Sequence, residues 1–239
     1  MTTFVLVHGA FRGGWAWQRV RPHLVAAGHD VHAPSLLGAG ERVALAAAVT
    51  GLDSWVDELE ALLVAEDLAD VVLVGHSQGG IVTTALAARV PERLRCVVHL
   101  DAAVPDPGER ALDLGPGGPV PDRDLLVPPR PLAADTADGG DLDAATAAWT
   151  SARLTPTPVA PSLDPVPAVP DGVRQIYAFC DRTPPGYPSQ VTRARLDARG
   201  TPYTVLAAGH DAPLTAPELV ADLLLSAAGQ TLDLHMSDI

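Results

Sequence analysis

The sequence contains no lysine and no asparagine, so all sixteen basic residues are arginine. Because Schiff-base catalysis needs a lysine amine, its absence excludes that class of enzyme mechanism. Cysteine is almost as scarce, since only Cys96 and Cys180 are present. Two cysteines are too few for a disulfide framework, and both lie in apolar, strand-like runs. We expect them to be small buried hydrophobic side chains.

Positive charge is also scarce, since 16 basic residues face 29 acidic ones and the net charge is −13. With no arginine cluster, this balance argues against nucleic acid or an anionic membrane surface as a partner. No run reaches the roughly 18 apolar residues of a membrane span. Met1 leads directly into an expected strand without a basic segment or signal-like core, so we expect a cytoplasmic protein.

Neither metal nor cofactor is expected, because no cluster of histidine, cysteine and acidic residues has ligand spacing. A small-molecule substrate is the expected partner, and the sequence leaves a homodimer open.

The chain has 239 residues, of which 47% are hydrophobic, which fits one globular domain with an insertion. Apolar runs alternate with amphipathic segments, a pattern that predicts an α/β fold with a mostly parallel central sheet and helices on both faces. Strands are expected at residues 3–8, 30–33, 71–74, 94–100, 173–180 and 203–207. Helices are expected at residues 15–27, 52–63, 81–89, 189–198 and 216–228.

Residues 104–170 differ from the rest, since they hold 14 of the 23 prolines and one modest helical candidate, residues 142–154. A structureless loop of this length is uncommon inside a compact domain, so we predict an inserted proline-rich cap. Residues 1–103 and 171–239 would then form the core. Residues 231–239 are expected to be a frayed tail.

A Gly-x-Ser-x-Gly motif, Gly75 to Gly79, stands between the apolar run 71–74 and a helical run that begins at Ile81. This strand–turn–helix context is that of a nucleophile elbow, where a sharp turn lifts a serine hydroxyl above the sheet. Ser77 is therefore the candidate nucleophile. Its hydroxyl needs a base and oxyanion donors close by.

In this architecture the acid and the base follow the serine in the order Ser, Asp or Glu, His. His210 follows the last expected strand, and the one later histidine, His235, lies in the tail. His210 is thus the candidate base. Two aspartates follow strands at the edge of the sheet where sites gather, Asp101 and Asp181, and chain order admits both.

A nucleotide-binding fold also begins with a strand, a glycine-rich loop and a helix. The spacing of Gly9, Gly13 and Gly14 does not match Gly-x-Gly-x-x-Gly, and the strand 30–33 ends in Pro34-Ser35 without an acid for a ribose hydroxyl. The sequence therefore argues against a nucleotide site.

Blocks spread along the whole core resemble the α/β-hydrolases, and within them the plant methyl-esterase and hydroxynitrile-lyase branch with its bacterial relatives. The blocks are Val5-Leu6-Val7-His8-Gly9-Ala10-Phe11-Arg12-Gly13-Gly14-Trp15-Ala16-Trp17, Gly28 to Pro34, Gly75 to Gly80, Leu100 to Pro105, Cys180-Asp181-Arg182 and Gly209-His210. The cap matches only in position and in Trp149.

This resemblance implies Ser77 as nucleophile, His210 as general base and then acid, and Asp181, in preference to Asp101, as the carboxylate that orients the imidazole. It also implies the backbone amides of Ala10 and Gln78 as oxyanion donors.

The lyases of this branch resemble one another in a threonine where Gly9 stands and a lysine where Asp211 stands. Without that cationic group for a leaving cyanide, the resemblance favours hydrolysis through an acyl-enzyme. The leading hypothesis is a serine hydrolase for a small, largely apolar ester, lactone or thioester, with Phe11 and Trp149 lining the acyl pocket. Two alternatives stay open: a non-hydrolytic natural-product tailoring enzyme on the same triad, and a small-molecule receptor with residual turnover.

Overall fold

The computed structural model describes residues 1–138 and 140–229, which build a six-stranded sheet in the order β2-β1-β3-β4-β7-β8. Every neighbouring pair in this sheet is parallel, which confirms the predicted α/β fold class. The strands are β1 (Thr3–Val7), β2 (Asp30–His32), β3 (Val71–His76), β4 (Leu94–Leu100), β7 (Gln175–Cys180) and β8 (Thr204–Leu206).

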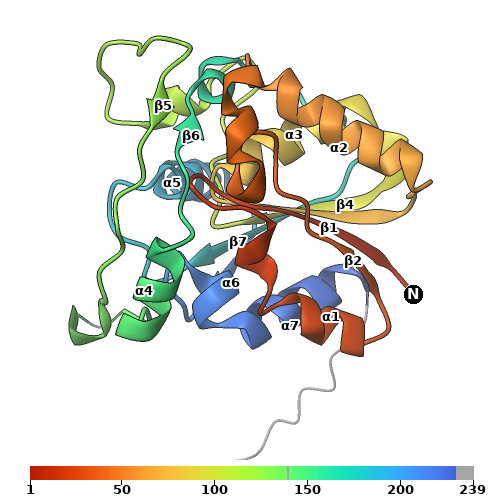
Figure 1. The fold of residues 1–239 in the computed structure, drawn as a ribbon. Helices are drawn as coiled ribbons and strands as arrows, with labels where there is room; N and C mark the ends of the chain where they lie inside the picture. Colours follow the sequence, from red (N-terminus) through yellow and green to blue (C-terminus); the bar gives the residue numbers. More distant parts are fainter. Residues whose placement is uncertain (139, 230–239) are drawn as a thin grey trace, which may run out of the picture.

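Helices cover both faces of the sheet, with α2 and α3 on one side and α1 and α7 on the other (Figure 1). The helices outside residues 104–170 are α1 (Arg21–Ala26), α2 (Asp53–Ala65), α3 (Gly79–Arg89), α5 (Pro188–Arg199), α6 (Ala212–Thr215) and α7 (Pro217–Ala227), with the 3-10 helices η1 (Gly14–Trp17), η2 (Gly40–Ala48) and η3 (Pro91–Arg93).

Side chains of β1 alternate between two apolar clusters. Phe4 and Leu6 pack with side chains of α1 and α7, whereas Val5 and Val7 pack with those of α2 and α3. A strand buried on both faces has apolar residues at every position, which explains the unbroken hydrophobic runs in the sequence. Cys96 and Cys180 are both free and buried, as expected.

The expected helix 15–27 is divided into η1 and α1. Pro22 lies in the first turn of α1, where its missing N–H costs no helical hydrogen bond. The first turn of α1, which contains Pro22, is therefore the start of a separate helix.

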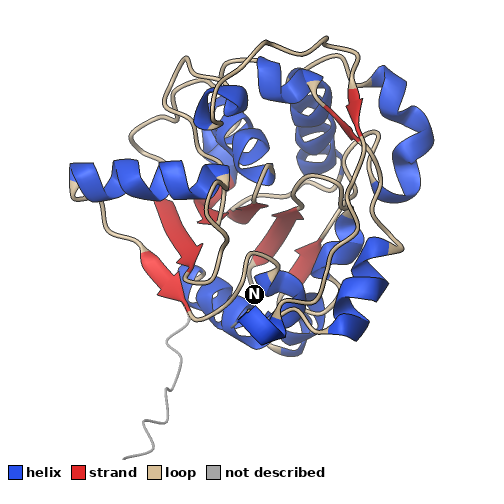
Figure 2. Ribbon diagram, turned by 90° about the vertical axis from the view of Figure 1, so that its left-hand side faces the viewer, coloured by secondary structure: helices blue, strands red, loops and turns tan. Residues whose placement is uncertain are grey.

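Residues 104–170 add no strand to the six-stranded sheet within the described ranges. Their elements, which include a separate antiparallel pair of strands, are η4 (Ala111–Leu114), β5 (Leu126–Val127), η5 (Thr136–Asp138), α4 (Ala144–Ser151), β6 (Thr157–Pro158) and η6 (Ala160–Leu163). Asp143 caps α4 by accepting from the amide of Thr146. Figure 1 places α4, β5 and β6 beyond the carboxyl ends of the strands, and Figure 2 looks onto this side.

The expected tail, residues 231–239, lies outside the described residues. In the part of the chain that is described, no helix combines the length and the apolar character needed to cross a bilayer.

Candidate active site

Ser77 occupies the turn between β3 and α3 with a left-handed backbone, φ 54°. This conformation is strained for a residue with a Cβ, and such strain gathers at functional sites. The turn is held by backbone hydrogen bonds from α3 and from the segment after β4, because the amides of Gly80 and Ala103 donate to the Ser77 carbonyl at 3.1 and 3.0 Å. The serine side chain is thereby fixed at the carboxyl end of β3.

The motif glycines provide the space for this turn. A Cβ on Gly75 would lie 2.5 Å from Oγ1 of Thr83 and 2.8 Å from the carbonyl oxygen of Gly79. A Cβ on Gly79 would lie 2.7 Å from the carbonyl oxygen of Val7. The close packing of β1, β3 and α3 therefore requires both glycines.

Three side chains form a continuous hydrogen-bonded chain at the carboxyl end of the sheet. Oγ of Ser77 lies 3.0 Å from Nε2 of His210, and Nδ1 of His210 lies 2.6 Å from Oδ2 of Asp101. In the tautomer with the proton on Nδ1, the imidazole donates to Asp101 and accepts from the serine hydroxyl. This is the geometry of a nucleophile, a base and an orienting carboxylate.

Asp101 follows β4 directly and is fully buried. Its backbone is left-handed (φ 43°), and its amide donates to the Ala178 carbonyl at 2.7 Å. Burial opposes ionisation of this carboxyl, but hydrogen bonds from His210 and from the hydroxyl of Thr183 to the same oxygen outweigh it, so its pKa lies below the usual value. A buried aspartate therefore stays charged beside the imidazole.

The prediction that Asp181 orients the imidazole is wrong, because Asp101 holds that place. Asp181 has a side chain that is 44% exposed, 3.6 Å from the guanidinium of Arg182. The residue of this loop that reaches the site is Thr183, through Asp101. Thr183 was not predicted from the sequence, although its position two residues after Asp181 places it in the loop that was expected to carry the acid.

His8 holds the loop that follows β1. Its Nδ1 donates to the Gly9 carbonyl at 2.8 Å, and its Nε2 accepts from the Leu36 amide at 3.0 Å. Burial lowers the pKa of His8 to about 4, which keeps the ring neutral and able to do both. Beyond this clamp, Ala10 and Gln78 line the same cavity as Ser77, and neither amide donates to a backbone carbonyl of the described residues.

His76 lies behind the base. Its Nε2 donates to the carbonyl of His210 at 2.8 Å, and the two ring centroids are 4.8 Å apart. Burial, together with the nearby His210, lowers the pKa of His76 to about 3, so it is neutral at pH 7. The ring of Tyr187 contacts His210 with a centroid separation of 4.4 Å. His76 and Tyr187 thus both restrict the imidazole.

A cavity of about 350 Å³ opens at Ser77. Its wall is mostly small or apolar, with a polar bridge where the Gln78 side chain donates to Oγ of Ser162 at 2.9 Å. The charged or ionisable groups in the wall are Asp101, His210 and the phenol of Tyr187. The remaining lining residues are Ala10, Ala103, Ala111, Leu112, Gly115, Val159, Pro188 and Ser189.

The structure places neither Phe11 nor Trp149 in this wall, which corrects both predictions of pocket residues. The ring of Trp149 is engaged by Trp15, at 5.4 Å between centroids, and by the guanidinium of Arg153, at 4.0 Å. Phe11 adopts φ 65°, and its amide donates to Oγ1 of Thr157 at 2.6 Å. Both residues therefore serve packing and loop geometry beside the cavity.

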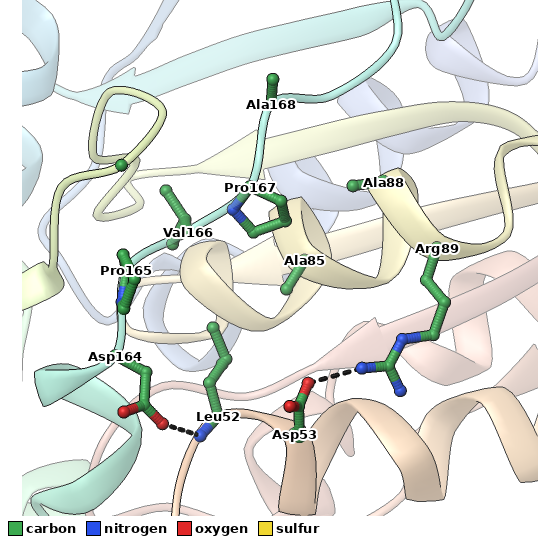
Figure 3. A pocket seen from close by; sticks show the side chains of 11 residues that line it. Leu52, Asp53, Ala85, Ala88, Arg89, Asp164, Pro165, Val166, Pro167 and Ala168 are labelled. Atoms are coloured by element: carbon green, nitrogen blue, oxygen red, sulfur yellow. Dashed lines mark hydrogen bonds and ion pairs between the residues drawn. The ribbon is translucent and has the colours of Figure 1, made fainter.

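A larger groove of about 840 Å³ lies between α2, α3 and residues 164–168, away from Ser77 (Figure 3). Its charged groups are paired with protein: Asp53 contacts Arg89, and Asp164 accepts from the Leu52 amide at 2.8 Å. In the described ranges, no group of three or more potential metal ligands comes together. The candidate site is therefore the cavity at Ser77.

Curated proteins that resemble this chain include an esterase, a lyase and a salicylic acid-binding protein. It is 41% identical over 116 residues to a carbendazim hydrolyzing esterase of Nocardioides sp., 48% of each chain. It is 40% identical over 105 residues to an alpha-hydroxynitrile lyase of Arabidopsis thaliana and 38% identical over 106 residues to salicylic acid-binding protein 2 of Nicotiana tabacum, in both cases 43% of this chain and 40% of the relative. The matched region spans about half the length of these relatives.

Solved structures match over nearly the whole chain. A methylesterase from Arabidopsis superposes with a TM-score of 0.75 and 25% identity, over 96% of this chain and 99% of that one. A pyrethroid hydrolase superposes with a TM-score of 0.73 and 24% identity, over 96% and 98%. The model of the alpha/beta hydrolase family matches residues 4–223. With this match, the parallel sheet and the serine elbow, the chain belongs to the alpha/beta hydrolase family.

Proposed function

We propose that the protein is a carboxylic-ester hydrolase that works through an acyl-enzyme on Ser77. The observation that carries the proposal is the unbroken hydrogen-bonded chain from Ser77 through His210 to Asp101, with the serine at the mouth of a cavity. Its similarity to the carbendazim hydrolyzing esterase and to methylesterases supports the same reaction class.

In the proposed reaction Oγ of Ser77 attacks the acyl carbonyl carbon while Nε2 of His210 takes the hydroxyl proton. Asp101 stabilises the imidazolium that forms and keeps its protonated Nδ1 in place. The amides of Ala10 and Gln78 are the proposed donors to the oxyanion. His210 then gives its proton to the leaving alcohol, and a water molecule that it activates hydrolyses the acyl-enzyme.

The lining of the cavity favours a small neutral substrate. No arginine is among its lining residues, so a carboxylate on the substrate would meet only the charge of Asp101 and the partial charges of the wall. Ala103, Ala111, Leu112 and Val159 offer apolar contacts for an acyl chain or a small alcohol. We therefore propose a small, largely apolar ester, lactone or thioester as substrate.

Two residues favour hydrolysis over cyanide elimination. A Cβ on Gly9 would lie 2.7 Å from Cβ of Ser77, so the threonine of the lyases has no room here. Asp211 stands where those lyases carry lysine, and its carboxylate is paired with Arg12. The site therefore has no free ammonium group in that place to receive a leaving cyanide.

The test is a panel of p-nitrophenyl esters with acyl chains of two to twelve carbons, with Ser77→Ala as control. We expect release that depends on Ser77, is fastest for short chains and disappears for the longest ones. Ala111→Phe should move the cut-off to shorter chains, whereas Trp149→Phe, outside the cavity wall, should not.

Labelling with a fluorophosphonate checks the acyl-enzyme independently of substrate choice. Wild type should be labelled at Ser77 and the Ser77→Ala variant should not. If wild type neither hydrolyses any ester nor reacts with the probe, the acyl-enzyme proposal fails and the receptor alternative gains. Labelling without hydrolysis would favour the tailoring alternative.

A further inference from the structure

Arg12 and Asp211 form an ion pair that is almost entirely shielded from solvent and lies next to the candidate site. The Arg12 side chain is 9% exposed and that of Asp211 is 12% exposed. Arg12 belongs to the loop after β1, two residues beyond Ala10, and Asp211 follows His210 directly. The pair therefore joins the loop of a proposed oxyanion donor to the loop of the proposed base.

The guanidinium of Arg12 contacts both loops at once. One terminal nitrogen donates to the carboxylate of Asp211, and the other donates to the Ala10 carbonyl at 3.0 Å. A planar guanidinium holds such a two-point contact in fixed geometry, which a lysine ammonium does not. One side chain thus fixes Ala10 relative to the residue that follows His210.

The backbone around Arg12 is shaped for this inward orientation. Phe11, between Ala10 and Arg12, has φ 65°, a left-handed conformation that is uncommon for an aromatic residue. Its amide donates to Oγ1 of Thr157, and its carbonyl accepts from the amide of Thr155 at 3.0 Å. The turn that precedes the buried Arg12 is therefore anchored to β6 and to the segment before it.

A gain in folding stability does not by itself explain why this ion pair is buried. Two buried charges lose hydration, and replacing such a pair by apolar residues is often neutral or stabilising. Burial opposes ionisation of Asp211, yet the Arg12 guanidinium outweighs it and holds the pKa of Asp211 below its usual value. Asp211 is therefore charged at pH 7, and the Arg12 guanidinium is always protonated in proteins. What such a charged pair adds is a defined distance between the two loops.

We propose that Arg12 and Asp211 are a positioning pair that sets the spacing between the oxyanion donor at Ala10 and the base at His210. This inference rests on the proposed acyl-transfer function. Neither residue lines the cavity, so both act through the catalytic groups that they hold in place.

The pair also balances charge around the imidazole. The groups that face His210 are Asp101 from the end of β4, His76 from the end of β3, Tyr187 from the start of α5, and the Arg12–Asp211 pair. Loss of Asp211 leaves the positive charge of Arg12 uncompensated close to the ring, whereas loss of Arg12 removes the group that keeps the buried Asp211 ionised. The imidazolium should therefore become harder to form when Asp211 is removed and should change less when Arg12 is removed.

The experiment measures the pH profile of kcat/KM for p-nitrophenyl butyrate in Asp211→Asn, Arg12→Met and Arg12→Lys. Asp211→Asn leaves the positive Arg12, so the acid limb should move to lower pH by about half a unit or more. Arg12→Met removes the guanidinium that keeps the buried Asp211 ionised, so Asp211 should become neutral and the acid limb should stay near that of wild type. A shift confined to Asp211→Asn would show that the charge of Arg12 acts on His210 once its partner is lost, whereas the positioning role is tested by Arg12→Lys.

Arg12→Lys keeps the charge but loses the second contact to the Ala10 carbonyl. We expect the acid limb of wild type and a kcat lowered about tenfold or more, with KM changed less than about threefold, because misplacement of a donor acts in the transition state. Arg42→Lys is the matched control, since the half-buried Arg42–Glu58 pair lies outside the cavity wall. It should leave kcat unchanged.

Unchanged kcat in Arg12→Lys would overturn the positioning role, and an unmoved acid limb in Asp211→Asn would overturn the charge balance around His210. If Arg12→Met fails to fold in thermal unfolding, Asp211→Asn and Arg12→Lys still decide. Failure of the proposed function is separate, because it appears as activity that survives Ser77→Ala, or as a wild type that neither hydrolyses an ester nor reacts with the fluorophosphonate.

Discussion

The carboxylate of Asp101 accepts a hydrogen bond from Nδ1 of His210 at 2.6 Å, although 109 residues separate the two in the chain. The contact joins the loop after β4 to the loop after β8. Because β4 neighbours β3, the strand that Ser77 follows, the acid approaches the base from the strand next to the nucleophile. In this protein the proposed acid thus follows β4, a strand in the interior of the sheet.

Exchange of the two aspartates for asparagine distinguishes their roles. Asp101→Asn should lower kcat by about 10³-fold or more, because the neutral amide no longer selects the productive tautomer of His210. Asp181→Asn should leave kcat within about twofold, since its exposed carboxylate contacts only Arg182 among the site loops. Steady-state hydrolysis of p-nitrophenyl butyrate measures both. Equal losses in the two variants would contradict the assignment.

Thr183 supports the charge on Asp101, so removal of its hydroxyl should weaken the base. Thr183→Val should lower kcat roughly threefold to tenfold, because a charge-assisted hydrogen bond to a buried carboxylate is lost. Thr183→Ser keeps the hydroxyl and should restore most of the rate. If valine and serine behave alike, the hydroxyl has no part in the reaction.

Gly9 packs against the nucleophile itself. In Gly9→Ala the new Cβ would lie 2.7 Å from Cβ and 3.3 Å from Oγ of Ser77, so the serine must shift. We expect kcat to fall about 10²-fold with little change in the melting temperature, because the displacement falls on the reacting atom. Gly172→Ala is the control, since a Cβ there meets nothing within 4 Å. Full activity in Gly9→Ala would show that this contact does not constrain Ser77.

Buried neutral histidines should make the protein unstable in acid. Burial lowers the pKa of His8 and His99 to about 4 and, with the nearby His210, that of His76 to about 3. Between about pH 6.5, the ordinary pKa of histidine, and these lowered values, the unfolded chain binds more protons than the folded protein. The free energy of unfolding therefore decreases as the pH is lowered, by about 1.4 kcal/mol per pH unit for each histidine.

Urea unfolding at pH 7 and pH 5 measures this dependence. Wild type should lose several kcal/mol between the two, on the order of 2 kcal/mol for each of the three histidines. His99→Gln, outside the candidate site, should reduce that loss by one histidine's share, whatever its effect at pH 7. An equal loss in the variant and wild type would mean that His99 is not held neutral in the folded state.

Local patterns in the sequence were enough to predict the strands, the turn at Ser77 and the position of His210. Unbroken apolar runs predicted strands buried on two faces, and glycines at fixed spacing around Ser77 predicted the turn, because strand burial and sharp turns depend on neighbours in the chain. His210 followed from chain order, since the topology brings the end of the last strand to the same edge as the elbow.

Which aspartate faces His210 was decided by the tertiary structure alone. Both candidates follow strands that end at the same edge, β4 and β7, so their sequence contexts are equivalent. Asp101 has a left-handed backbone and its carboxylate reaches Nδ1 of His210, whereas the partly exposed Asp181 lies beside Arg182. Neither local sequence indicates which of the two side chains reaches the imidazole, and the resemblance to a family favoured the wrong residue.

The sequence by itself determined the order of strands and helices, the elbow at Ser77 and the place of His210, because these depend on periodicity and on steric limits within a few residues. Only the tertiary structure decided the acid, the cavity wall and the Arg12–Asp211 pair, since each depends on side chains from distant segments meeting within a hydrogen bond's reach. The cavity wall illustrates the difference: Trp149, the cap residue singled out in the sequence, packs against Trp15 instead, and alanine and leucine residues of η4 line the cavity.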